Sequence, residues 1–181
     1  MGIDSTTTRN NIEKNAQRLN EDCLNTCKNN FLYAAHLNKW RYTLGIISTV
    51  AAGLIVLSVS TNFGPTNTII PLCSVVALLS SAIVTTWNPG KNVELHQRVG
   101  NEYDAIQKKA QNFIDVDIPD HDIPNEDLKE GLYKLNNERE ILYRTYSQVV
   151  IPEWVHKKVK KKLESGEAKY DFESKPEVTK I

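Results

Sequence analysis

Leu44-Gly-Ile-Ile-Ser-Thr-Val-Ala-Ala-Gly-Leu-Ile-Val-Leu-Ser-Val-Ser60 and Thr68-Ile-Ile-Pro-Leu-Cys-Ser-Val-Val-Ala-Leu-Leu-Ser-Ser-Ala-Ile-Val-Thr-Thr-Trp87 are two runs that contain no charged residue. They are 17 and 20 residues long, and a short connection with Gly64 and Pro65 separates them. The apolar core of a bilayer is about 30 Å thick and is crossed by roughly 17 to 25 helical residues. The sequence therefore predicts a hairpin of two transmembrane helices, over 44–60 and 68–87.

The alternative is a hairpin buried inside a soluble interaction bundle. A helix on the surface of a soluble protein normally keeps one polar face. Neither run has a charged stripe, and no Asp, Glu, Lys or Arg occurs between residues 44 and 87. This pattern favours the membrane over the soluble bundle.

The charged residues near the two runs predict an orientation. Lys39 and Arg41 precede the first run, Lys91 and Arg98 follow the second, and the connection between the runs has no basic residue. Because basic residues favour the cytoplasmic side, we expect both termini in the cytoplasm and the connection between the runs outside. Aromatic and basic residues at the ends of the runs are expected at the membrane surface: Trp40, Arg41 and Trp87.

The rest of the chain predicts further helices and no strands. A helix over about 11–43 should run without a break into the first span, since no Pro or Gly lies between Ile12 and Gly45. Apolar positions three and four residues apart predict two more cytoplasmic helices, over about 93–114 and 126–151, and Asn125 suits the N-cap of the last one. The expected fold is an all-α membrane protein. Its spans adjoin a cytoplasmic bundle made of the long N-terminal helix and a C-terminal helical hairpin, in one unit over 1–163.

The helix predicted over 126–151 supports two further predictions, one about Arg139 and one about its own length. Arg139 is the one charged member of an apolar stripe, which suggests that it fixes the register of its helix through a carboxylate, with Glu102 as the expected partner. If the helix over 126–151 is about 39 Å long, it returns the chain to the bilayer at the basic segment 152–163.

The basic segment 152–163 has two interpretations. It either lies on an anionic membrane surface or is a solvated basic helix. Its surface residues are Trp154, Lys157, Lys158, Lys160, Lys161 and Lys162. The tail over 164–181 is expected to be disordered.

No set of residues predicts catalysis. The four histidines are scattered, and the aspartates over 115–122 lack the glycine and the bidentate glutamate of a calcium loop. Cys23, Cys27 and Cys73 are too few for a disulfide framework. Zero net charge predicts no direct binding of nucleic acid. We therefore expect no enzyme activity, no metal and no cofactor.

Both predicted spans carry small and hydroxyl-bearing residues at helical spacing. Such ridges let helices approach closely and form hydrogen bonds in the membrane. The residues expected to pack or to face a pore are Gly45, Ser48, Thr49, Ala52 and Gly53 in the first span and Ser74, Ala77, Ser81, Thr85 and Asn88 at the second. Either both ridges lock the spans together, or one lines a path between subunits. Since two helices cannot enclose a channel, the second interpretation requires a homo-oligomer.

The order of these elements resembles a known family. The segments that carry the resemblance are Asn38-Lys-Trp-Arg-Tyr-Thr-Leu-Gly-Ile46, Trp87-Asn-Pro-Gly-Lys-Asn-Val-Glu-Leu-His-Gln-Arg-Val-Gly-Asn-Glu-Tyr103 and Asn137-Glu-Arg-Glu-Ile-Leu-Tyr-Arg-Thr-Tyr-Ser-Gln-Val-Val-Ile-Pro152. Together they are similar to the SLATT domain, the two-transmembrane effector found beside nucleotide-second-messenger and SLOG genes in prokaryotes. The resemblance covers about residues 12 to 163.

The resemblance implies a pore-forming or membrane-disrupting effector of antiphage defence that ends in abortive infection. It also implies a separately encoded sensor, such as a cyclic-oligonucleotide synthetase or a reverse transcriptase. The alternative function is a membrane-anchored scaffold that recruits a cytoplasmic partner.

Overall fold

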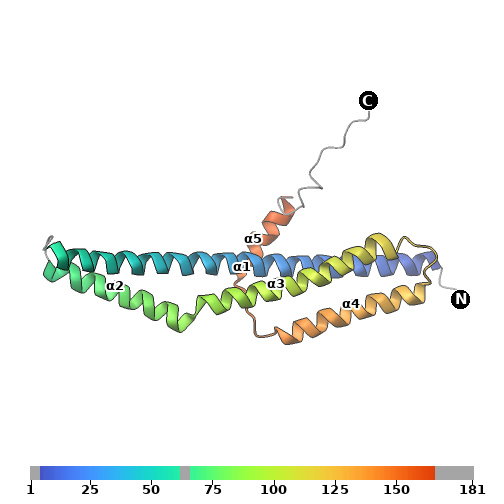
Figure 1. Cartoon of the computed structure of the whole chain (residues 1–181). Helices are drawn as coiled ribbons and strands as arrows, with labels where there is room; N and C mark the ends of the chain where they lie inside the picture. The colour runs from blue at the N-terminus through green and yellow to red at the C-terminus, as the bar shows by residue number, and fades with distance from the viewer. Residues whose placement is uncertain (1–4, 62–65, 166–181) are drawn as a thin grey trace, which may run out of the picture. The chain divides into compact units, whose positions relative to one another are not determined.

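The computed structural model describes residues 5–61 and 66–165, and this part of the chain is helical without any strand (Figure 1). The helices are α1 (Ser5–Thr61), α2 (Thr66–Trp87), α3 (Pro89–Asn112), the short π-helix η1 (Phe113–Asp117), α4 (Asn125–Thr145) and α5 (Glu153–Glu164). The expected all-helical fold is confirmed.

The chain divides into two compact units where the sequence predicted one. The first, here called the charged unit, contains Met1–Leu32 and Arg98–Ile181, and the second, the hairpin unit, contains Tyr33–Gln97. The hairpin unit has only four charged side chains: Lys39, Arg41, Lys91 and Glu94. Helices α1 and α3 each contribute residues to both units.

Helix α1 joins two predicted elements into one. The predicted helix over 11–43 and the predicted span over 44–60 are continuous in α1, which has 57 residues. No proline interrupts this stretch, so the backbone hydrogen bonds of the helix continue past Leu44. The helix begins six residues earlier than predicted.

In the hairpin unit, α2 runs back along the C-terminal part of α1 (Figure 1). Leu44 and Ala51 of α1 and Ser80 of α2 are buried, and Ser48, Ile55, Cys73 and Ala77 are half-buried. These residues recur at three- and four-residue spacing, so they form one face on each helix. We call these two faces the hairpin seam.

Asn88 separates α2 from α3. Its φ is 41°, in the left-handed region that Asn tolerates better than most residues. Pro89 then begins α3, where its fixed φ suits the first helical position. The backbone N–H of Lys91 donates to Asn88 Oδ1 at 3.3 Å, which caps the helix. Helix α3 therefore begins four residues before the predicted start at 93.

The core of the charged unit is made of apolar residues at helical spacing. On α3 and η1 these are Val99, Tyr103, Ile106, Ala110 and Phe113. Ile12, Ala16, Leu19 and Cys23 are buried on α1, and Leu128 and Leu135 on α4. These faces form the core of the charged unit.

Two glycines allow aromatic rings to approach the helix backbones in this unit. A Cβ added to Gly100 would lie 2.7 Å from Phe31 Cε1, and one added to Gly131 would lie 2.9 Å from Phe113 Cε2. Both distances are too short for any other residue without displacement of a ring. The sequence analysis assigned no role to either glycine.

Two local predictions about α4 are wrong. Helix α4 ends at Thr145, six residues before the predicted end at 151, and the chain then turns toward Pro152. Proline disfavours a helical conformation at the residue before it, which ends helical structure ahead of α5. The N-cap of α4 is Pro124, not Asn125, and no side chain caps it.

The shorter α4 also removes one argument about the basic segment. Its 21 residues correspond to about 32 Å, less than the 39 Å on which the predicted return of the chain to the bilayer depended. Helix length therefore no longer supports a membrane contact for the basic segment.

Candidate functional site

The hairpin unit exposes most of its apolar surface. In the most apolar stretches of its two long helices, only 11% and 6% of the residues are buried. The core helix of a soluble protein would be mostly buried, whereas these helices expose Ile46, Val50, Leu54, Leu72 and Leu78, among others. The chain thus has two helices long and apolar enough to cross a membrane.

The predicted small-residue faces divide into two groups. Ser48 and Ala77 lie in the hairpin seam. The other predicted residues are exposed: Gly45, Thr49, Ala52, Gly53, Ser74, Ser81, Thr85 and Asn88. We call these eight residues the outer ridge. The first alternative, in which both predicted faces lock the two spans together, does not describe this hairpin.

The sequence analysis missed five of the seven seam residues: Leu44, Ala51, Ile55, Cys73 and Ser80. Ala51 and Ser80 are 5% and 6% exposed and adjoin predicted residues, Ala52 and Ser81. Cys73, Ala77 and Ser80 are four and three residues apart, and this spacing could have indicated the buried face of α2. However, Ala77, Ser81 and Thr85 fit the helical period equally well, so periodicity alone did not select between adjacent positions.

The outer ridge is exposed, and the hydroxyls of Thr49, Ser74 and Thr85 donate hydrogen bonds within their own helices. A Cβ added to Gly45 or Gly53 would meet no atom within 4 Å. Thr49 Oγ1 donates to the carbonyl of Gly45 at 2.9 Å, and Thr85 Oγ1 donates to that of Ser81 at 2.9 Å. Each hydroxyl oxygen keeps acceptor capacity, so the ridge suits close contact with another helix in an apolar environment.

The predicted membrane-surface residues of the hairpin unit are exposed where they are described. Trp40 Nε1 donates to His36 Nε2 at 3.0 Å, within one turn of α1. Arg41 is exposed overall, and its guanidinium lies 3.6 Å from the position of a Cβ on Gly90. The side chain of Trp87 lies outside the described part of the chain.

The charged unit pairs Arg139 differently from the prediction. Arg139 Nη2 lies 3.2 Å from Asp22 Oδ2 of α1, not beside Glu102. Glu102 Oε1 instead accepts a hydrogen bond from the Tyr146 hydroxyl at 2.7 Å. This bond favours the neutral phenol and raises the pKa of Tyr146. The sequence identified both residues, but their partners come from α1 and from the turn after α4.

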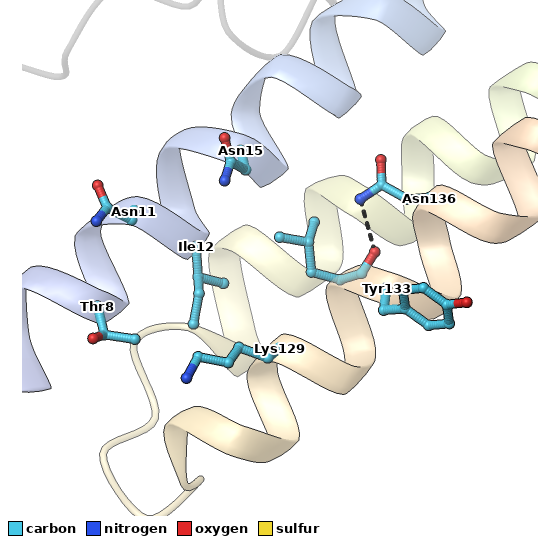
Figure 2. Close-up of a pocket in the computed structure, with 8 residues that line it drawn as sticks. Thr8, Asn11, Ile12, Asn15, Lys129, Tyr133 and Asn136 are labelled. Atoms are coloured by element: carbon cyan, nitrogen blue, oxygen red, sulfur yellow. Dashed lines mark hydrogen bonds between the residues drawn. The ribbon is translucent and has the colours of Figure 1, made fainter.

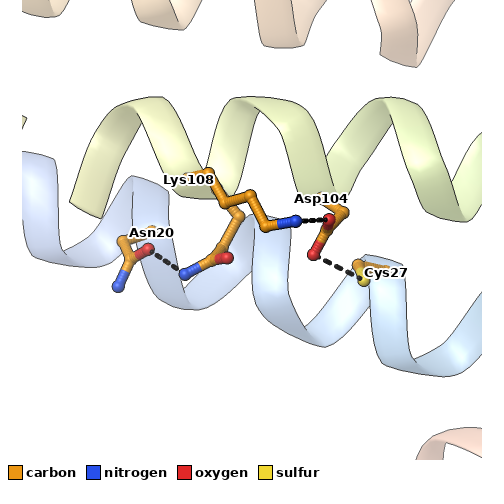
Figure 3. A network of polar contacts seen from close by, with 5 residues as sticks. Asn20, Cys27, Asp104 and Lys108 are labelled. Atoms are coloured by element: carbon orange, nitrogen blue, oxygen red, sulfur yellow. Dashed lines mark hydrogen bonds and ion pairs between the residues drawn. The ribbon is translucent and has the colours of Figure 1, made fainter. Parts of the chain in front are cut away.

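A second polar network joins α1 to α3 in the charged unit (Figure 3). Gln107 Nε2 donates to Asn20 Oδ1 at 2.9 Å, and Lys108 pairs with Asp104 at 2.6 Å. Cys27 Sγ contacts Asp104 at 3.9 Å. Burial raises the pKa of the Cys23 and Cys27 thiols to about 11, so both are protonated near neutral pH and are poor nucleophiles.

Among the hollows of the charged unit, two lie between its helices. The larger, of about 650 Å³, is a groove between α1 and α4 with Ile12, Leu132 and Tyr133 among its lining residues (Figure 2). Asn11, Asn15 and Asn136 add amide groups to the lining (Figure 2). The smaller, of about 290 Å³, is lined by Arg139 and by three tyrosines: Tyr103, Tyr143 and Tyr146. Neither contains a set of residues suited to catalysis, and no group of three metal-ligating side chains occurs among residues 5–61 and 66–165.

Comparison of this chain with protein families, with characterised proteins and with solved structures found no match.

Proposed function

We propose that the chain is an oligomeric, two-span effector that forms a pore in a bacterial inner membrane or disrupts that membrane. On this proposal it belongs with SLATT-like proteins of antiphage defence, as the order of its elements suggests. Activation then requires a separately encoded sensor, such as a cyclic-oligonucleotide synthetase or a reverse transcriptase. Both termini are proposed to lie in the cytoplasm, on the side of Lys39, Arg41, Lys91 and Arg98.

The outer ridge is the observation that carries the proposal. The hairpin seam already holds α1 and α2 together with Ala51, Ser80 and their neighbours. Small residues beyond those required by the seam remain exposed, including Gly45, Gly53 and Ser81. Without a hydrophobic driving force in lipid, helices associate through small residues and hydroxyl groups of this kind. We infer that the ridge joins one hairpin to the next.

The same ridge is suited to line a path through an oligomer. The stretch from 44 to 87 contains no ionisable side chain other than Cys73, which argues against proton-coupled transport. Hydroxyl groups such as those of Thr49, Ser74 and Thr85 provide weakly polar positions along the helices. A weakly polar or hydrophobically gated pore fits this composition.

Replacement of ridge residues tests the proposal. Gly53→Leu and Ser81→Leu add bulk where close approach is required, so we expect loss of oligomers and of membrane depolarisation when the sensor is active. Val75→Leu is the matched control, because Val75 is exposed on α2 outside the ridge. The measurements are the size of the detergent-solubilised complex and the signal of a membrane-potential dye. Toxicity with unchanged polarisation would contradict the proposal, as would wild-type behaviour of both ridge variants.

A membrane-anchored scaffold is the second candidate, and the groove between α1 and α4 favours it. Its apolar residues Ile12 and Leu132 beside amide groups suit a helix or peptide of a cytoplasmic partner. Exchange of residues 44–87 for an unrelated two-span hairpin separates the candidates. A scaffold keeps its activity after the exchange, whereas a pore-forming effector loses it.

A further inference from the structure

Helix α5 is amphipathic, and its apolar side is already in use. Val155 and Val159 are 0% and 5% exposed. Asn29 Nδ2 of α1 donates to His156 Nδ1 at 2.9 Å, which fixes α5 within the charged unit. An interfacial helix inserts its apolar face into the lipid. Because that face of α5 is covered by protein, any contact between α5 and a membrane has to use its other side.

The other side of α5 is basic and carries an aromatic residue. Trp154, Lys158 and Lys161 follow one another at i, i+4 and i+7, so they share one face of the helix. Trp154 is 41% exposed, and both lysines are exposed. We call these three residues the α5 basic face.

The lysines of the α5 basic face lack the ion pairs that neutralise several cations of α4. The α4 cations Lys129, Lys134 and Arg144 pair with glutamates one turn away in the same helix. Within residues 5–61 and 66–165, neither Lys158 nor Lys161 forms an ion pair. Helix α5 contains five lysines and two glutamates, which gives it a net charge of +3 in a chain whose net charge is zero.

We propose that the α5 basic face binds the anionic headgroups of a lipid bilayer without inserting into it. This inference rests on the proposed membrane location of the hairpin. Each lysine near an anionic membrane surface strengthens binding by about five-fold, and the attraction fades beyond a Debye length. An exposed tryptophan beside the lysines suits the headgroup layer.

Nucleic acid is a poorer fit to the same lysines. Proteins that bind DNA through its phosphates typically make about six to ten such contacts. The α5 basic face offers two lysines, whereas Lys157 and Lys160 of α5 and Lys134 and Arg144 of α4 pair with glutamates. The apolar hairpin, in contrast, brings the chain to a bilayer in any case.

Lysine acetylation of the full-length chain in lipid nanodiscs tests the inference. Discs of phosphatidylcholine alone are compared with discs that also contain phosphatidylglycerol, and acetylation rates are read by mass spectrometry. We expect Lys158 and Lys161 to react about five-fold more slowly in the anionic discs at about 0.1 M salt. The difference should vanish at about 1 M salt, where the Debye length is about 3 Å. Lys129 and Lys134 on α4 are internal controls and should react alike in both discs.

A pair of variants supplies the second measurement. Lys158→Gln with Lys161→Gln should abolish the protection of the neighbouring Lys162 in anionic discs, whereas Lys129→Gln with Lys134→Gln should preserve it. Equal rates for Lys158 and Lys161 in both discs would overturn the inference. Protection that appears in phosphatidylcholine discs only after RNA is added would also overturn it. If the hairpin fails to enter the discs at all, the proposed membrane function fails instead, so the two failures are distinguishable.

Discussion

Glycine residues have different surroundings in the charged unit and in the hairpin unit. In the charged unit, Gly100 and Gly131 lie against the rings of Phe31 and Phe113, so the missing side chains are part of the packing. In the hairpin unit, Gly45 and Gly53 face open space. The glycines of the charged unit lie in packed contacts, whereas Gly45 and Gly53 lie on the exposed surface of the hairpin unit. A glycine therefore indicates a close approach in one unit and an available surface in the other.

The largest difference in stability is expected between a substitution at a packed glycine and one at an exposed glycine. Gly100→Leu adds a side chain where even a Cβ lies 2.7 Å from Phe31, and we expect a loss of about 3 kcal/mol in the free energy of unfolding. Gly53→Leu should change the unfolding of the monomer by less than about 0.5 kcal/mol, because nothing lies within 4 Å of its Cβ position. Thermal unfolding of the detergent-solubilised monomer checks both. Equal losses in the two variants would remove the distinction between the units.

Ser80 and Ser81 sharpen the comparison within one helix. Ser80 is 6% exposed in the hairpin seam, and Ser81 is exposed on the outer ridge. Ser80→Leu overpacks the seam and should destabilise the monomer by about 2 kcal/mol. Ser81→Leu should leave the monomer intact and reduce the size of the oligomer. Unfolding and size-exclusion measurements on the two variants give opposite patterns if the seam and the ridge are assigned correctly. The same pattern for both would show that the helix is rotated.

A pH dependence follows from the buried thiols of the charged unit. Burial raises the pKa of Cys23 and Cys27 from the ordinary 9.0 to about 11. Because the raised value belongs to the folded state, this contribution to stability is complete below pH 9 and is lost as the pH rises toward 11. Replacing both thiols by alanine should flatten the fall in stability across this range. An unchanged fall in stability between pH 9 and pH 11 in this variant would contradict the prediction.

The smallest expected effect concerns the partner of Arg139. The pair with Asp22 is about half exposed, so its contribution should be no more than about 1 kcal/mol. Double-mutant cycles with Arg139→Gln should give a coupling energy with Asp22→Asn and none with Glu102→Gln. The reverse result would restore Glu102 as the partner of Arg139. Chemical denaturation of each variant supplies the required free energies.

The sequence predicted periodic features well and partners poorly. The stripe from Val99 to Phe113 and the continuity of α1 follow from spacing and from the absence of proline, which are local properties of the chain. Arg139 was recognised as the exception in its stripe, but its partner depends on how α1 and α4 pack. The helices also pack through Phe31 against Gly100 and Phe113 against Gly131. The periodicity of the sequence does not predict these ring contacts.

The sequence predicted which kinds of residue make up the candidate site but not how they are arranged. Small and hydroxyl-bearing residues at helical spacing predicted that both apolar helices pack closely against others. Whether such a residue lies in the seam or on the ridge depends on a shift of one position along the helix, since Ser80 is buried and Ser81 is exposed. The two serines have the same chemistry and adjacent positions, so only the three-dimensional contact distinguishes them.

The turn at Asn88 has a mechanical consequence for the hairpin. Helices α1 and α3 both continue without a break from the hairpin unit into the charged unit. Helix α2 does not, because it lies wholly in the hairpin unit and meets α3 at one residue of positive φ. The backbone N–H of Asn88 donates to the Val84 carbonyl, and the Asn88 carbonyl accepts from Asn92, so the conformation of this one residue determines the direction in which α3 leaves α2. A substitution that disfavours positive φ at position 88 would therefore change the angle between α2 and the start of α3.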